Sequence, residues 1–123
     1  MNDSKANWKV IRYADVLLLL AEALNENGKT DQALVYLNQV RKRAGVANYA
    51  GLSQTDARSK IYLERRFELT MEGHRWFDLL RTGLALTTMQ SYGMKSYNTV
   101  FPVPQGQIDV VHNVAIFPQN PGY

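Results

Sequence analysis

Apolar residues recur at helical spacing in the first half of the chain. Between Ile11 and Leu24 they stand mainly three and four positions apart, which lays an apolar stripe along one face of a helix. The run from Val16 to Ala21 widens that stripe until the helix is apolar almost all round. A helix of this kind packs between neighbouring helices rather than on a surface. The pattern therefore predicts a first helix that docks onto other helices.

A second helix follows after a short turn. Gly28 ends the first helix, because glycine readily adopts the left-handed conformation found there, and Thr30 is predicted as the N-cap of the next. The second stripe runs from Ala33 to Ala44, and Gly45 ends it. So short a connection makes the two helices antiparallel. Residues 10–45 are thus typical of one tetratricopeptide-like helix pair, which cannot bury its own face alone.

Residues 53–84 form a charged helical segment. The motif Ser53-Gln54-Thr55-Asp56 predicts a capped start for a third helix, with Asp in place of the usual Glu, and this helix should run to about Met71. Glu72-Gly73-His74 then interrupts it, and a short helix is expected from Arg75 to Thr82.

Charged and aromatic side chains alternate closely in this segment, and ionic groups packed beside aromatics must be paired. We expect Arg65 to pair with Glu68 or Glu72, and Arg75 with Asp78. These partly buried ion pairs would tie the third helix to the first helix pair.

The end of the chain has a different character. Residues 91–123 hold all four prolines, which rules out a long helix and predicts an extended, Pro-rich tail that wraps the helices. Short extended pieces are expected at Thr99 to Val103 and at Val110 to Val111. With a polar lead-in over residues 1–9, the whole chain, 1–123, is predicted to be a single all-α domain.

Composition narrows the range of functions. The net charge is +3, but basic and acidic residues are interleaved, which disfavours a nucleic-acid partner. The chain contains no cysteine, so disulfides, thiolate catalysis and zinc bound by cysteine are excluded within these residues. The apolar run Val16 to Ala21 lies between Asp15 and Glu22 and is shorter than a secretory core or a membrane span, so we expect no signal peptide in this chain.

Catalytic and metal-binding patterns are weak. Glu64 and Glu68 lie one helical turn apart, as paired carboxylates of a glycosidase could, but nearby arginines favour structural ion pairs. His74 and His112 are too far apart in sequence for a local metal motif. We therefore expect a protein that is not an enzyme and that has no metal or cofactor.

Aromatic side chains are the remaining candidates for ligand contact, because their faces can stack on sugar rings. Those on helical stripes are expected in the core: Tyr13, Tyr62, Phe67, Trp76 and Phe77. Those in loops are the candidate ligand-binding residues: Trp8, Tyr49, Tyr92 and Tyr97.

Four sequence blocks in fixed order resemble the C-terminal part of the SusD/RagB family. They are Val10-Ile11-Arg12-Tyr13-Ala14-Asp15-Val16-Leu17-Leu18-Leu19-Leu20-Ala21-Glu22-Ala23, then Leu37-Asn38-x-Val40-Arg41-x-Arg43-Ala44-Gly45, then Ile61-x-x-Glu64-Arg65-x-x-Glu68-Leu69-x-x-Glu72-Gly73-x-Arg75-x-x-Asp78-Leu79-x-Arg81, and finally Phe101-Pro102-Val103-Pro104 with Gln119-Asn120-Pro121-Gly122-Tyr123. Together they cover nearly the whole chain. Residues 110–117 are more apolar than the Asn-rich lead to the ending that is usual in the family.

The resemblance implies a surface-exposed lipoprotein of the outer membrane in Bacteroidetes-type bacteria. Such a protein binds glycans or other nutrients without catalysis and acts with a TonB-dependent, SusC-like transporter. It also implies that glycan contacts lie largely upstream of this chain, which would then be a truncated homologue, an excised domain or a fragment. The alternative that the residues leave open is a tetratricopeptide-like adaptor that binds a peptide.

Overall fold

The computed structural model describes residues 9–123, and over these residues the fold is all-helical, as the sequence predicted. In chain order the elements are α1 (Tyr13–Glu26), α2 (Thr30–Arg43), α3 (Gln54–Glu68), α4 (Arg75–Arg81), α5 (Ala85–Met89), the 3₁₀ helices η1 (Gln90–Tyr92) and η2 (Ser96–Thr99), and α6 (Gln105–Val111). The chain divides into two compact units, one ending at His74 and the other beginning at Arg75. A single domain over 1–123 stays a prediction.

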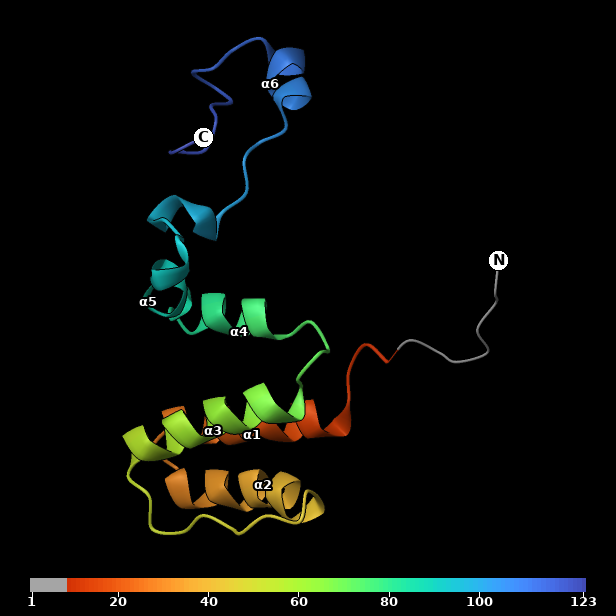
Figure 1. The fold of residues 1–123 in the computed structure, drawn as a ribbon, viewed down its shortest axis with the longest axis vertical. Helices are drawn as coiled ribbons and strands as arrows, with labels where there is room; N and C mark the ends of the chain where they lie inside the picture. The colour runs from red at the N-terminus through yellow and green to blue at the C-terminus, as the bar shows by residue number, and fades with distance from the viewer. Residues whose placement is uncertain (1–8) are drawn as a thin grey trace, which may run out of the picture. The chain divides into compact units, whose positions relative to one another are not determined.

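Three helices make up the first unit. Figure 1 shows α1 and α2 antiparallel, and the connection after α2 runs back along that helix, so that α3 is parallel to α2 and antiparallel to α1. Both α2 and α3 pack against α1. The buried core is drawn from all three helices: Ala14, Leu17, Leu18, Ala21, Ala33, Leu34, Leu37, Val40, Ala57 and Ile61. The prediction that the first helix docks onto other helices is thereby confirmed.

Burial of α1 is less complete than its apolar sequence predicted. Tyr13 is 74% exposed, and Val16, Leu19 and Leu20 are also exposed. Because α2 and α3 cover only one side of α1, the opposite side stays uncovered. The prediction that Tyr13 and Phe67 lie in the core was wrong for the same reason, since each projects from the open side of its helix; Tyr62 is half-buried against the core.

Asn25 joins the ends of all three helices. Its fully buried amide Nδ2 donates to the Gln54 carbonyl at 2.9 Å, and Gln54 Nε2 donates back to the Asn25 carbonyl at 2.6 Å. Thr30 Oγ1 donates to Asn25 Oδ1 at 3.0 Å. Thr30 is therefore not the N-cap predicted from sequence: Lys29 takes that position, and the Thr30 hydroxyl satisfies a buried amide oxygen instead.

The start of α3 matches its sequence motif. Ser53 is the N-cap, and its Oγ accepts a hydrogen bond from the Asp56 amide at 3.1 Å while donating to Asp56 Oδ2 at 2.6 Å. The helix ends at Glu68, three residues before the Met71 predicted. Met71 itself has a left-handed φ of 68°, which an α-helix cannot include.

The second unit is a succession of short helices, and α4 lies where a short helix was predicted. Trp76 is half-buried, but Phe77 is 68% exposed rather than in the core. Val110 and Val111, predicted to be extended, lie in α6, and Thr99 lies in η2. Proline limits helix length here without preventing helices: Pro104 stands at the N-cap of α6, where its missing amide proton is not needed.

Residues 119–123 are held along residues 97–103 by a set of contacts that we call the C-terminal clasp. Gln119 pairs with the backbone of Val103, accepting from its amide at 2.7 Å and donating to its carbonyl at 2.9 Å. Asn120 Nδ2 donates to the Phe101 carbonyl at 2.6 Å, and Tyr123 Oη donates to the Val100 carbonyl at 2.9 Å. Side chains thus replace the backbone ladder that would join two strands.

Candidate functional site

The charged residues singled out from sequence lie at the junction of α3 with α1 and α2. Arg65 Nη1 donates to Asp15 Oδ1 at 2.7 Å, and both side chains are buried. The predicted partners of Arg65, Glu68 and Glu72, bind other arginines. Glu68 and Glu72 contact Arg12 at the start of α1, whereas Arg65 reaches a carboxylate on α1 itself.

Arg12, just before α1, gathers the two glutamates. Its Nη1 donates to Glu68 Oε1 at 2.9 Å, while Nε and Nη2 bind the two carboxylate oxygens of Glu72 at 2.8 and 2.7 Å. Arg43 at the end of α2 binds the other oxygen of Glu68 at 2.5 Å. The hydrogen bonds that Arg12 donates lower the pKa of Glu72 below its ordinary value, and acceptance of these bonds by Glu72 and Glu68 raises the pKa of Arg12. This cluster joins the start of α1 and the end of α2 to the end of α3.

Glu64 is engaged in the same way. Its Oε2 accepts from Arg41 Nη1 at 2.6 Å, and both side chains are largely buried. Glu64 and Glu68, the carboxylates considered for glycoside hydrolysis, are therefore each held by an arginine of α2. A carboxylate held by arginine in this way suits a structural role better than that of a general acid.

The second unit holds the other charged residues named from sequence. Asp78 Oδ1 accepts from Arg81 Nε at 2.8 Å within α4, and the side chain of Arg75 is exposed at the start of that helix. His112 caps the end of α6 in a left-handed conformation. Over residues 9–123 no group of three metal-ligating side chains comes together.

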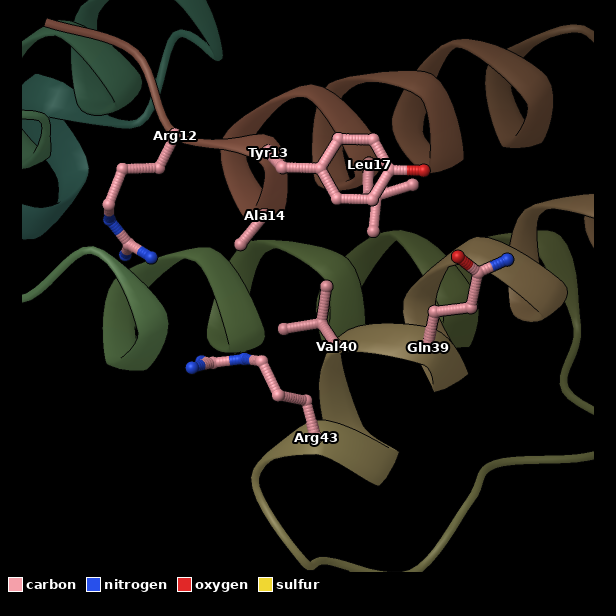
Figure 2. A pocket seen from close by; sticks show the side chains of 7 residues that line it. All are labelled: Arg12, Tyr13, Ala14, Leu17, Gln39, Val40 and Arg43. Atoms are coloured by element: carbon pink, nitrogen blue, oxygen red, sulfur yellow. The ribbon is translucent and has the colours of Figure 1, made fainter. Parts of the chain in front are cut away.

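A pocket of about 290 Å³ opens between the start of α1 and the end of α2. Ala14, Leu17 and Val40 give it an apolar lining (Figure 2). Polar side chains border it: Arg12, Tyr13, Gln39 and Arg43. In Figure 2 Arg43 points from α2 toward the α3 ribbon. The pocket can hold one bulky apolar group with hydrogen-bonding groups around it.

Loop aromatics differ in how much of the ring is free. Tyr49 is half-buried, with the Arg41 guanidinium 3.8 Å from its ring centroid and Lys60 Nζ at 5.4 Å. Tyr97 packs edge-on against Tyr123, with 5.3 Å between ring centroids. Tyr92 is 81% exposed, while Trp8 lies outside the described residues. Tyr49 packs on the core of the first unit, and Tyr97 belongs to the C-terminal clasp of the second unit.

Comparison with known proteins decides the classification. The model of the SusD family matches residues 1–123, the whole sequence. The chain belongs to the SusD family.

Its relatives are considerably longer. The SusD-like protein P2 of Formosa agariphila is 33% identical over 135 residues, which cover 98% of this chain and 27% of that protein. A second relative from the same organism, SusD-like protein P25, is 35% identical over 114 residues, which cover 82% of this chain and 22% of that protein. The chain therefore spans about a quarter of the length of these curated relatives.

Solved SusD structures share the fold. A SusD homolog from Bacteroides thetaiotaomicron matches with a TM-score of 0.83 and 33% identity over 98% of this chain and 28% of that one. A laminarin binding SusD-like protein matches with a TM-score of 0.75 and 40% identity over 93% of this chain and 23% of that one. Over residues 9–123, no helix of this SusD-family chain combines the length and apolarity required to cross a membrane.

Sequence reasoning missed one partner in each of the ion pairs of Glu64, Arg65, Glu68 and Glu72 in this SusD-family chain. Asp15, Arg12, Arg41 and Arg43 are the partners of the α3 charges, and none was assigned a pairing role from sequence. A usable signal was present, since Asp15 is a charge inside the otherwise apolar pattern of α1. A charge at such a position needs a buried partner.

Proposed function

We propose that this chain is part of a non-enzymatic nutrient-binding component at the surface of the bacterial outer membrane, which binds glycan and acts with a TonB-dependent transporter of the SusC type. The observation that carries the proposal is the match of the SusD family model to residues 1–123. The resemblance of its ordered sequence blocks to the family implies the same activity.

The arginine-bound state of the glutamates supports a role without catalysis. Glu64 is held by Arg41, and Glu68 by Arg12 and Arg43, which leaves neither carboxylate poised as a general acid. This part of the proposal would be contradicted if the chain hydrolysed laminarin and if Glu64→Gln or Glu68→Gln abolished that hydrolysis. We expect no hydrolysis by either the parent chain or the variants.

Laminarin is the first glycan to test, because a laminarin binding SusD-like protein is 40% identical to this chain. We expect the glycan contacts to lie mainly in the parts of the longer proteins that this chain does not match. Calorimetric titration of the isolated chain with laminarin should therefore give little heat. A chimera in which this chain replaces the matching residues of the laminarin binding protein should bind laminarin, whereas a folded chimera without binding would count against the proposal.

Tyr92 is the loop aromatic best placed to contribute to such a chimera, since its side chain is 81% exposed. Loss of one stacked ring should weaken binding roughly two- to tenfold in Tyr92→Ala. Phe101→Ala is the matched control, because Phe101 is equally exposed but is not among the loop aromatics predicted to contact ligand. Equal effects of both substitutions would remove Tyr92 from the proposed contacts.

The adaptor hypothesis finds less support in the fold. A peptide-binding array needs about three stacked helix pairs. In the first unit α3 is antiparallel to α1 and follows a long connection, so it does not continue the pair as a second repeat (Figure 1). A defined peptide motif recovered with the isolated chain would revive that hypothesis.

A further inference from the structure

The uncovered side of α1 is a continuous apolar surface. Five exposed residues, Tyr13, Val16, Leu19, Leu20 and Ala23, fall within one arc of about 120° on a helix with 3.6 residues per turn. Glu26, at the last turn, is the charged residue nearest the edge of this arc. We call these five residues the α1 outer face. A face of this composition is typical of a helix that has a further helix against it.

The pocket between α1 and α2 adjoins the α1 outer face. Tyr13 belongs to both, and the pocket lining of Leu17 and Val40 continues the apolar surface toward α2 (Figure 2). Helices pack by inserting side chains of one into hollows of the other. The pocket, at about 290 Å³, is a hollow that one large aliphatic or aromatic side chain can fill.

The length of the SusD-family relatives indicates what covers the α1 outer face. The structural relative from Bacteroides thetaiotaomicron matches 98% of this chain with only 28% of its own residues, so most of a SusD-family protein lies outside the matched region. We infer that the α1 outer face and its adjoining pocket bind an amphipathic helix from that remaining part of the polypeptide, with one bulky apolar side chain seated between Leu17 and Val40.

The absence of native cysteine allows a direct test with thiol labelling. Leu19→Cys places a thiol on the α1 outer face, and Lys42→Cys places one on an exposed polar position of α2 as the control. Each variant is prepared in this chain alone and in a chimera in which this chain replaces the matching residues of the Bacteroides thetaiotaomicron homolog. The probe is Ellman's reagent, and the readout is the labelling rate of the folded protein.

Both thiols should react rapidly in the chain alone. In the chimera, the rate at residue 19 should fall by more than about tenfold, because reaction then requires local opening of the helix contact, while the rate at residue 42 should stay unchanged. Equal rates at residue 19 in the two proteins would overturn the inference. Slow labelling at residue 19 in the chain alone, accompanied by dimer mass in sedimentation, would assign the face to a second copy and overturn it as well.

A second readout does not depend on the chimera. The chain alone should bind an apolar dye such as anilinonaphthalene sulfonate at the α1 outer face, and the Val16→Ser/Leu20→Ser variant should lose most of that fluorescence. Unchanged fluorescence in this folded variant would show that the face is not an accessible apolar surface, and would contradict the inference.

Discussion

Arg65 of α3 donates a hydrogen bond of 2.7 Å to the carboxylate of Asp15 on α1, across 50 residues of sequence. The two side chains are only 4% and 9% exposed. Each charge would be strongly destabilising in the core without the other. The pair therefore specifies which face of α3 lies against α1.

Removal of one member of this pair should destabilise the first unit. Arg65→Met leaves Asp15 buried without this partner, and we expect a loss of roughly 3–5 kcal/mol in the free energy of unfolding. Arg75→Met is the control, since Arg75 is exposed and should leave the thermal midpoint unchanged. The double variant Asp15→Leu/Arg65→Met should recover part of the loss. Equal midpoints for Arg65→Met and the parent protein would mean that the pair is merely solvated.

The pKa of Glu72 predicts a pH dependence of stability. Hydrogen bonds from Arg12 lower this pKa in the folded state, so ionised Glu72 stabilises the fold above its ordinary pKa. The stabilisation is lost as the pH falls from about 5 through the lowered folded pKa. The parent protein should have a larger free energy of unfolding than Glu72→Gln near neutral pH. Calorimetry should show that this difference becomes smaller as the solution becomes acidic.

Arg12→Met should abolish this difference, because it removes the cause of the shift. Carboxyl NMR titration provides the direct measurement. An ordinary Glu72 pKa in the parent protein would contradict the bidentate contact.

Gln119 holds the C-terminal clasp through its side-chain amide, which acts both as a hydrogen-bond acceptor and as a donor. Gln119→Ala removes the hydrogen bonds to the Val103 amide and carbonyl, for a local loss of about 1–3 kcal/mol. Gln119→Glu keeps the acceptor for the Val103 amide but loses the donor. Hydrogen exchange of that amide should be fast in the first variant and slower in the second. Slow exchange in Gln119→Ala would show that the side chain does not hold the clasp.

Gly122 meets two constraints at once, whereas Gly28 meets one. Both have positive φ, 97° and 73°, but a Cβ at Gly122 would overlap the Tyr97 ring and one at Gly28 meets open space. Gly28→Ala should lower stability by about 1–2 kcal/mol through backbone strain alone. Gly122→Ala should also displace Tyr97 from Tyr123, which near-ultraviolet circular dichroism of tyrosine would detect. An unchanged tyrosine signal would contradict this packing.

Local signals in the sequence were sufficient for the approximate positions of α1 to α4, but not for α6, which includes residues that were predicted to be extended. Gly28, Gly45 and Ser53 mark ends and starts within a residue or two of those observed, because caps depend on backbone conformation and neighbouring atoms. The family resemblance was likewise carried by ordered residues and was confirmed over residues 1–123. Thr30 shows where local reasoning failed, since its hydroxyl serves a buried amide of another helix end.

The amino-acid sequence by itself determined that residues 9–123 are mainly helical, roughly where α1 to α4 lie, and to which family the chain belongs. Periodicity and capping act over one or two turns, and family motifs are read directly from residue order. Tertiary structure alone decided that Arg65 binds Asp15 and that Tyr13 is exposed. Partners 50 residues apart meet only when helices pack, and the side of an almost wholly apolar helix that stays open depends on which neighbours are present.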